Sequence, residues 1–501
     1  MPSRLITGLC IAMCASSAAL AQTAAQIDAL VRDEMAKQNI VGMAIAIVKN
    51  GAIAYAKGYG HTDLGRTQVV TTDTIFRWAS VSKTLTAAAT LKLAEENADI
   101  DLDDKVAKHV VYWPRFGTKG DIRIRHLLSN RSGIIHYKNK KHCRDNRSPN
   151  YERDRHTSKF YHAEQGVDVF ERQPLCFPPG TDFKYSTFGF SLLGAAVEGA
   201  SGQSYASWVS SNIQIPLGMS SLRQATGSRA GFDQRCHILR PVLAGNAAWK
   251  LPGSGWESNI IDLAKFANAL LQGSLLDDTA RLWTDVPGNP GYGYGVMHSP
   301  DGSRVWHRGR NENSRTGLYL YPESSDHLGI VLMINGVHSK DKRIAHHLAD
   351  LFGRNNYDSR APVVDECRDR CYGKLSVLWQ QGDKDILLRR GYSSKHLLAE
   401  WTFLRQAGYY SNDIEPYLIG GEIYWDALFS KGTAENAIWL DLDDAHFAQK
   451  LHELSNTGLR PIDVESYKIG GKRRWAILFR HGSDTTISPN FSPGSREQAQ
   501  D

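Results

Sequence analysis

The sequence of 501 residues lacks the short motifs with which proteins most often hold a metal ion. It contains no Cys-x-x-Cys pair and no His-Glu-x-x-His segment, so it offers no spaced set of zinc ligands. Neither sign of charge dominates, because 59 Lys and Arg stand against 53 Asp and Glu, and the formal net charge is +6. A mild and dispersed excess of this kind does not indicate a nucleic-acid partner. We therefore expect no metal, no cofactor and no nucleic acid.

Long apolar runs are also missing. After Ala21, no segment approaches the roughly 20 apolar residues that cross a bilayer. The one apolar stretch, from Leu5 to about Ala15, is shorter than that; it follows Arg4 and precedes small residues ending at Ala21. This layout is typical of a cleavable signal peptide. We expect residues 1–21 to be removed and the mature chain to be secreted or periplasmic, without stable membrane insertion.

Cysteine is scarce. Of seven cysteines, two precede the expected cleavage site and five follow it: Cys143, Cys176, Cys236, Cys367 and Cys371. In an oxidising compartment some of these should pair, and an odd number leaves at least one thiol free. Cys367 and Cys371 are close in sequence, and a Cys143–Cys176 bond could close a long loop. The sequence leaves the connectivity open.

The order of apolar patterns predicts one large α+β domain. Strand-like runs occupy both ends of this region and helical spacing fills the middle. The expected helices cover 25–38, 84–97, 189–200, 261–273 and 344–352, and the expected strands cover 42–48, 52–59, 292–297, 304–307, 317–321 and 328–335. Asn50-Gly51 is a strong hairpin turn between the first two strands. This order predicts one antiparallel sheet built from both ends of the domain and flanked by helices, plus a helical region.

The C-terminal part contains an internal repeat. The segment from Glu400 to Phe429 aligns with Lys450 to Phe479 at a constant offset, with matching glycines, glutamates and aromatics. Each unit has the pattern of a helix, a glycine cap, a strand, a Gly-Gly turn and an aromatic strand. We therefore divide the chain into a signal peptide (1–21), a hydrolase domain (22–356), a linker (357–395), two tandem repeats forming a small α+β domain (396–483) and a disordered tail (484–501).

One short motif offers nucleophilic chemistry. A serine hydroxyl needs a base within hydrogen-bond reach, and Ser80 and Lys83 lie one helical turn apart on the same face of the expected helix. Burial lowers a lysine pKa, which turns the amine into a useful base. A Ser-x-x-Lys spacing is common by chance, and we interpret the second copy, Ser339 to Lys342, as such an accident.

Further motifs surround the first copy. The segment Phe76 to Thr86 resembles the nucleophile segment of class C β-lactamases, and Ile124 to Gly133 resembles the family signature Arg-His-Leu-Leu-x-x-x-Ser-Gly. A Pro-Pro-Gly element at Phe177 to Gly180 precedes Tyr185-Ser186-Thr187, and His307-Arg308-Gly309 occupies the place of a Lys-Thr-Gly or His-x-Gly element. From about Ala25 to Gly353, the chain thus resembles the serine β-lactamase-like family, which includes penicillin-binding proteins and family VIII esterases. The resemblance implies the β-lactamase/transpeptidase-like fold.

The resemblance also implies roles for individual residues. Ser80 would be acylated, Lys83 would accept its proton, and Tyr185 would relay a proton to the leaving group and help activate the deacylating water. The backbone N–H groups of Ser80 and Arg310 would bind the oxyanion. Thr187, His307 and Gly309 would line the substrate side, with His307 as a polar or cationic contact.

Three departures from the family pattern bear on the substrate. Thr187 stands where the β-lactamases carry an amide side chain, His307 replaces lysine, and Arg308 and Arg310 replace small residues. The run Tyr185 to Gly189 is most similar to the mitochondrial serine β-lactamase-like protein and to bacterial esterases and peptidases. These departures argue against efficient β-lactam hydrolysis.

The remaining features favour a peptide substrate. The C-terminal repeats resemble the tandem repeat of polyglycine hydrolases, which are secreted endopeptidases. The basic segment 138–159 is either a lid that recognises a carboxylate or a solvated insertion. We therefore rank peptides first, small esters second and β-lactams third. The alternative from another class is a catalytically silent protein that binds peptide or cell-wall material, although such a protein would need none of Ser80, Lys83 and Tyr185.

Overall fold

The computed structural model describes residues 23–96, 100–136, 162–225, 229–235, 238–284, 286, 291–354, 386–392, 394–419, 422–432 and 436–481. Nearly all described residues from 23 to 354 form one compact unit, and those from 386 to 481 form a second. The expected signal peptide, the basic segment 138–159, most of the expected linker and the C-terminal tail lie outside the described residues. Among the five later cysteines only Cys176 is described; it is disulfide-bonded, so its partner lies outside the described part.

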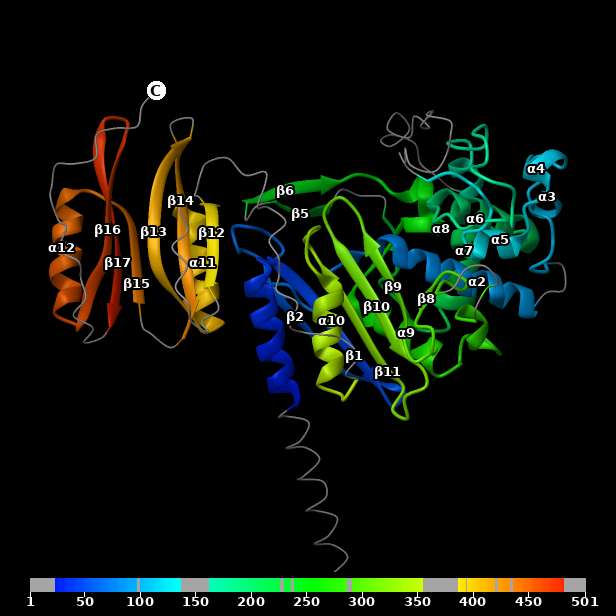
Figure 1. The fold of residues 1–501 in the computed structure, drawn as a ribbon, viewed down its shortest axis with the longest axis horizontal. Helices are drawn as coiled ribbons and strands as arrows, with labels where there is room; N and C mark the ends of the chain where they lie inside the picture. Colours follow the sequence, from blue (N-terminus) through cyan, green and yellow to red (C-terminus); the bar gives the residue numbers. More distant parts are fainter. Residues whose placement is uncertain are drawn as a thin grey trace, which may run out of the picture. The chain divides into compact units, whose positions relative to one another are not determined.

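The first unit is built on a six-stranded antiparallel sheet (Figure 1). Its strand order is β2-β1-β11-β10-β9-β8. The strands are β1 (Gly42–Lys49), β2 (Ala52–Gly60), β8 (Met297–His298), β9 (Val305–Arg310), β10 (Arg315–Tyr321) and β11 (Leu328–Ile334). β1 pairs with β11 although they lie far apart in sequence; Met43, for example, pairs with Ile334, 291 positions later. The prediction of one sheet assembled from both ends of the domain is confirmed.

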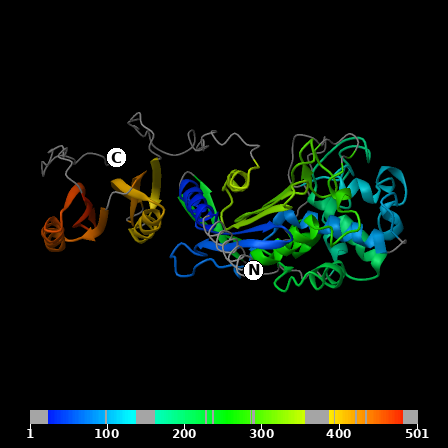
Figure 2. The same ribbon diagram turned by 90° about the horizontal axis from the view of Figure 1, so that it is seen from below.

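The central strands are buried on both faces. In β1, Ala44 and Ala46 belong to the core of the helical region, whereas Ile45 and Ile47 point to the opposite side and are equally buried. The helix of residues 23–37 and α10 (Asp341–Asp350) cover one face, and α9 (Ile260–Leu271) covers the other. Figure 2 shows helices on each side of the sheet. Double burial explains why β1 and β11 are almost uninterrupted apolar runs.

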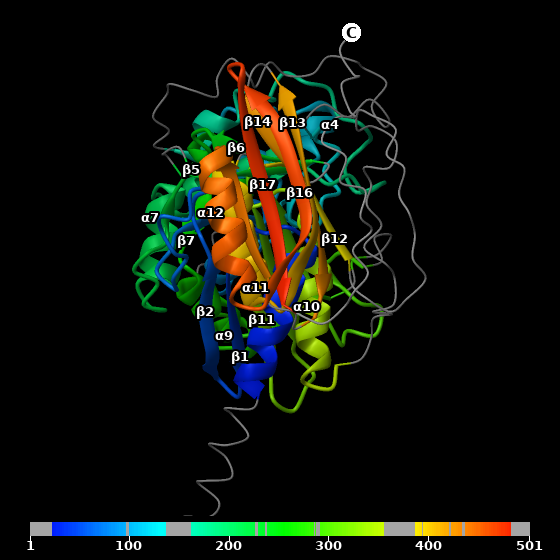
Figure 3. The ribbon, with the colours of Figure 1, turned by 90° about the vertical axis from the view of Figure 1, so that its left-hand side faces the viewer.

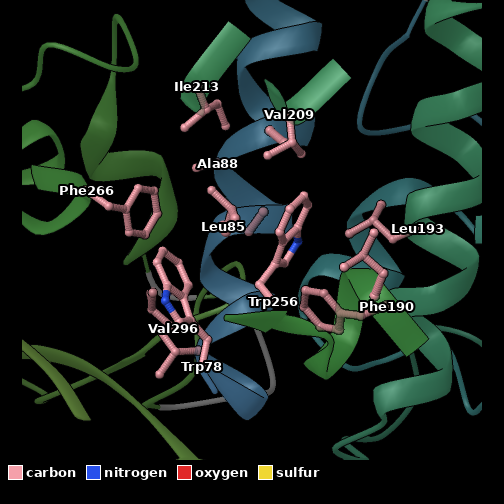
Figure 4. Close-up of a cluster of buried hydrophobic side chains, with 14 of the residues drawn as sticks. Trp78, Leu85, Ala88, Phe190, Leu193, Val209, Ile213, Trp256, Phe266 and Val296 are labelled. Atoms are coloured by element: carbon pink, nitrogen blue, oxygen red, sulfur yellow. The ribbon is translucent and has the colours of Figure 1, made fainter. Parts of the chain in front are cut away.

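The helical region packs around α2 (Ser82–Glu96) and α6 (Thr187–Ser201). Figure 4 shows its core, in which Leu85 of α2 lies among Trp256, Val209 and Phe266. The shorter helices are α3 (Val106–His109), α4 (Gly117–Gly120), α5 (Ile124–Leu128), α7 (Tyr205–Val209) and α8 (Leu251–Ser254), with a π-helix at η3 (Ser210–Gln214). Four 3-10 turns complete this region: η1 (Ala79–Val81), η2 (Ala163–Gly166), η4 (Ala248–Lys250) and η5 (Thr279–Leu282). Two small sheets, β3-β7-β4 and β5-β6, consist of β3 (Phe76–Arg77), β4 (Arg223–Gln224), β5 (Arg229–Arg235), β6 (Ile238–Ala244) and β7 (Trp256–Ser258).

One expected strand is wrong. The segment 292–297 was predicted to be extended, but only its last residue lies in a strand, β8. Gly291 and Gly295 both adopt positive φ, 84° and 70°, and Tyr292 makes a single bridge to Met297. The segment therefore turns back on itself, because glycine permits the left-handed backbone that a strand excludes.

The second unit contains two copies of one strand–helix–strand–strand motif (Figure 3). The first copy has β12 (Ile386–Tyr392), α11 (Ser394–Gln406), β13 (Tyr409–Ile419) and β14 (Glu422–Lys431). The second has β15 (Asn436–Leu442), α12 (Asp444–Ser455), β16 (Leu459–Ile469) and β17 (Lys472–His481). The strand orders β12-β14-β13 and β15-β17-β16 are equivalent, and Gly408 and Gly458 cap the helices with φ of 80° and 82°.

Each copy begins one strand earlier than the sequence pattern suggested. β12 lies inside the segment expected to be a linker, and it pairs with β14 at the edge of its sheet. The two copies pack through β13 and β16, where the backbone N–H of Ile414 donates to Asp463 Oδ2 at 2.8 Å. The Trp425 and Tyr467 rings meet edge-to-face at 5.2 Å between centroids. Each sheet thus covers an apolar face of the other copy.

Candidate active site

The expected nucleophile lies on a strained turn. Ser80 is in η1, directly before α2, and its neighbour Ala79 has a φ of +47°. Trp78 is fully buried and donates its indole N–H to Ser258 Oγ at 2.7 Å, which anchors the turn. Positive φ at a non-glycine residue costs free energy and is concentrated at functional sites. The turn lies against β9, where a Cβ on Gly309 would come within 2.2 Å of the Trp78 carbonyl oxygen.

Lys83 lies within hydrogen-bond distance of Ser80, where the motif predicts the base. Its side chain is 0% exposed, and its Nζ lies 3.2 Å from Ser80 Oγ, 3.0 Å from Thr187 Oγ1 and 2.7 Å from the Gly253 carbonyl oxygen. Burial, with a smaller contribution from the nearby Lys250 cation, holds the lysine pKa well below its usual value. The structure contains no carboxylate that acts on Lys83 to offset this effect within the described residues. The buried amine therefore gives up its proton more readily than an exposed lysine does.

The deprotonated form of Lys83, which is the form that can act as a base, has defined hydrogen-bond directions. A neutral amine has two N–H groups and one lone pair. The Gly253 carbonyl can only accept a hydrogen bond, and the Thr187 hydroxyl accepts the second N–H. The lone pair of Lys83 then remains for the hydroxyl proton of Ser80. Thr187 thus orients the base, a role that differs from the substrate contact expected from the sequence.

The segment that carries Tyr185 is held by the chain between residues 130 and 136. The Ser186 backbone N–H donates to Asn130 Oδ1 at 2.9 Å, and the Thr187 N–H donates to His136 Nδ1 at 3.2 Å. Because a backbone N–H always donates, His136 Nδ1 is unprotonated. These bonds fix the start of α6 and with it the position of Tyr185.

Tyr185 lies in the middle of the expected constellation. Lys83 Nζ is 4.7 Å from the centroid of the Tyr185 ring. The ring centroid lies 5.6 Å from His136, 6.2 Å from His307 and 6.3 Å from Tyr292. The structure therefore brings Ser80, Lys83 and Tyr185 together, and it adds His136 and Tyr292 to them.

His307 faces the same space as Tyr185. Its side chain is 1% exposed, and Nδ1 lies 3.1 Å from the Arg308 carbonyl oxygen. A carbonyl only accepts, so Nδ1 carries the proton and Nε2 carries a lone pair. Burial lowers the pKa of His307 to about 3. Of the two contacts expected, polar or cationic, the structure favours the polar one.

The backbone of Arg310 points toward the nucleophile. The Asn311 N–H donates to the Ser314 carbonyl at 3.2 Å across the β9–β10 turn. Hydrogen-bonded and non-hydrogen-bonded pairs alternate along an antiparallel ladder, so the adjacent Arg310–Arg315 pair is of the second kind. The Arg310 N–H is consequently directed to the other edge of β9, against which η1 lies. The Arg310 side chain is exposed and lies on the face of Arg308, so only the backbone of Arg310 can serve the site.

Sequence reasoning missed several members of the site. The Gly253 carbonyl carries no side-chain signal, and His136 and Tyr292 are single residues in otherwise ordinary segments. Lys250 acts on both Lys83 and His136 through its charge. The second Ser-x-x-Lys copy is not part of the site, since the Ser339 hydroxyl donates to the Gly336 carbonyl at 3.0 Å.

No metal or membrane feature accompanies this site in the described part of the chain. No three His, Cys, Asp or Glu side chains there are grouped as metal ligands. Among the same residues, no helix combines the length and apolar character needed to cross a membrane.

Comparisons with known proteins agree with the geometry. Protein flp of Staphylococcus aureus strain NCTC 8325 is 26% identical over 413 residues, which cover 76% of this chain and 79% of flp. The human mitochondrial serine beta-lactamase-like protein LACTB is 27% identical over 306 residues, covering 48% of this chain and 55% of LACTB. The octameric penicillin-binding protein homologue from Pyrococcus abyssi superposes with a TM-score of 0.56 at 25% identity, covering 66% of this chain and 78% of that one.

Each of the two units matches the model of a known protein family. The polyglycine hydrolase-like structural repeat matches residues 387–432 and 437–481, which are the two copies described above. The beta-lactamase model matches residues 27–354, well over half of the chain. The resemblance seen in the motifs is confirmed, and the chain belongs to the beta-lactamase family of serine hydrolases.

Proposed function

We propose that this protein is an exported hydrolase that cleaves amide or ester bonds through an acyl-enzyme on Ser80, with peptides as its substrates. The observation that carries the proposal is the contact at 3.2 Å between Ser80 Oγ and Lys83 Nζ, whose pKa is lowered by burial. A buried lysine whose pKa is lowered well below its usual value costs stability, and such groups concentrate at catalytic sites. A protein that only binds ligands has no use for this arrangement.

The proposed reaction has two halves. The Ser80 hydroxyl gives its proton to Lys83 as Oγ attacks the substrate carbonyl carbon, and the backbone N–H groups of Ser80 and Arg310 bind the resulting oxyanion. The tetrahedral intermediate collapses when Tyr185 delivers a proton to the leaving group. Water then attacks the acyl carbon with proton transfer to the same groups, which releases the acid and restores Ser80.

Three features favour a peptide over a β-lactam. The C-terminal unit matches the polyglycine hydrolase-like repeat, which associates this domain with peptide bonds. The His307 ring is neutral, so the position of the family's lysine offers no cation to a β-lactam carboxylate. The single hydroxyl of Thr187 already accepts a hydrogen bond from Lys83. It therefore offers less to a β-lactam than the longer amide side chain that β-lactamases carry at this position. Export rests on the signal-like layout of residues 1–21.

The test is intact-mass analysis of the purified protein after incubation with a fluorophosphonate and, separately, with benzylpenicillin. We expect a stable fluorophosphonate adduct that peptide mapping places on Ser80 and that Ser80→Ala abolishes. A lasting penicilloyl adduct would indicate a penicillin-binding peptidase, and rapid regeneration would indicate a β-lactamase. Absence of any adduct in the wild type would overturn the proposal and favour the silent, binding-only alternative.

A further inference from the structure

The strand that completes the site is supported by a strand on one side only. Along His307 to Arg310, β9 pairs with β10, while the described part of β8 pairs only with Val305 and Trp306. The other edge of β9 faces η1 and Ser80. Along these residues β9 therefore has ladder hydrogen bonds to β10 alone, and a misplacement of about 1 Å in a catalytic group can lower a rate about 10²-fold.

A buried ion pair holds this strand from behind. Arg308 alternates with His307 and so projects from the opposite face, where Nε and Nη2 donate to the two carboxylate oxygens of Asp341, both at 2.6 Å. Asp341, the first residue of α10, is 0% exposed and also accepts the Tyr319 hydroxyl at 3.1 Å. Arg315 lies 3.8 Å away from the same carboxylate. A bidentate pair of this kind fixes both the position and the plane of a guanidinium group.

We propose that Asp341 is a positioning residue for the reaction, acting through Arg308 on the backbone of β9. The pair fixes the position of the Arg308 carbonyl, which accepts a hydrogen bond from His307 Nδ1–H, and it fixes the direction of the Arg310 N–H beside Ser80. This role rests on the proposed function. It also gives a reason for Arg308, which replaces the small residue usual in the family.

Charge makes the carboxylate essential to this arrangement. Arg308 and Arg315 both approach Asp341 on this face of the sheet. Without the carboxylate, two guanidinium groups would face each other with no anion between them, and a half-buried cation would be unpaired. The strain would fall on β9, since Arg308 is the residue most closely bound to Asp341.

The competing explanation is that Asp341 only anchors α10. The protein offers a matched control, because Glu34 anchors the same helix without touching β9. Glu34 is 2% exposed, and it accepts from Arg343 Nε at 3.0 Å and lies 3.1 Å from His347 Nδ1. Glu34→Gln therefore breaks a comparable buried pair of α10, on the side of the helix that faces residues 23–37.

The experiment compares Asp341→Asn, Arg308→Lys and Glu34→Gln in the full chain. For each we would measure the melting temperature, the rate of Ser80 labelling by a fluorophosphonate, and kcat and KM for a p-nitrophenyl ester. Asp341→Asn and Arg308→Lys should lower kcat and the labelling rate by about tenfold or more, with KM within about twofold, because the oxyanion develops only in the transition state. Glu34→Gln should lower the melting temperature to a similar extent and keep kcat near the wild-type value.

The outcomes separate this role from the function on which it rests. Equal losses of labelling rate in Asp341→Asn and Glu34→Gln, with a labelled wild type, would overturn the positioning role alone. A wild type that does not label would overturn the proposed function and this role with it. Should Asp341→Asn fail to fold, Arg308→Lys decides, because it keeps the charge and loses the bidentate geometry; unchanged kcat in that variant would overturn the role.

Discussion

At the scale of single residues, the unusual feature is a lysine with no exposed surface and three oxygen neighbours. Lys83→Met keeps the length of the side chain and removes the base. We expect Ser80 labelling to slow by about 10²-fold or more, the size of a general-base contribution. The melting temperature should change by only a few degrees, because burial of an amine is itself unfavourable. A large fall in melting temperature with labelling preserved would show that Lys83 serves packing.

The same lysine predicts the pH dependence of acylation. Burial lowers its pKa, so the neutral, proton-accepting form is present above the lowered pKa and disappears as the pH falls through it. The labelling rate should therefore be constant above the lowered pKa of Lys83, over a pH range that reaches below the usual lysine pKa, and decline as the pH falls through it. His136 and His307 are already neutral with pKa values of about 3 and contribute no step near neutrality. A rate that rises toward acid pH would contradict this assignment.

The sequence predicted side chains of the site better than its backbone groups. Ser80 and Lys83 were found because the chemistry requires those residue types one helical turn apart, and Tyr185 because its segment resembles the family motif; the structure brings the three together. The carbonyl of Gly253 could not be found in this way, since every residue has one. His136 shows the second limit, because only the folded chain shows that its ring accepts a hydrogen bond from the Thr187 N–H.

At the scale of elements, the contact between β9 and the nucleophile turn requires a glycine, Gly309, at the point of closest approach. Gly309 has no positive φ, but a Cβ there would lie 2.2 Å from the Trp78 oxygen and 3.1 Å from Ala79 Cβ. Gly309→Ala should push β9 away from η1, lowering stability by about 1–3 kcal/mol and slowing labelling more strongly than the stability loss explains. Gly336→Ala is the control, since its Cβ would meet nothing nearer than 3.8 Å. Equal behaviour of the two variants in denaturation and labelling assays would refute the steric argument.

The elements that the sequence predicted are those with a strong period. β1 and β2 were correct because an apolar run, an Asn-Gly turn and a second run specify a hairpin locally. The strand expected over 292–297 was wrong because its aromatic residues favour a strand, while Gly295 within it and Gly291 just before it adopt positive φ. β12 was missed since its partner β14 follows it by more than 30 residues, and no local pattern reports such pairing. Periodicity thus predicted the elements, and long-range pairing decided their limits.

At the scale of the whole molecule, the two units have separate sheets and should respond to pH separately. In the repeat unit, Asp413 and Asp463 occupy equivalent positions and form a side-chain hydrogen bond across the β13–β16 contact. Two carboxyl groups can bond in this way only when they share a proton. Burial, with Asp413 and Glu415 as further causes, raises the pKa of Asp463 to about 7.

The sign of the resulting pH dependence follows from linkage. An acid whose pKa is raised on folding binds more protons in the native state. Its contribution to the free energy of unfolding is therefore fully present below the unfolded pKa of about 3.9 and is lost as the pH rises toward 7. The unfolding transition of the repeat unit should therefore shift to lower temperature between about pH 4 and pH 7, while Asp463→Asn should flatten this dependence. Glu415→Gln, an exposed neighbour that leaves the pair intact, should keep most of it. Scanning calorimetry of the three proteins across that range measures the effect, and an equally steep dependence in Asp463→Asn would show that the shared proton is not its source.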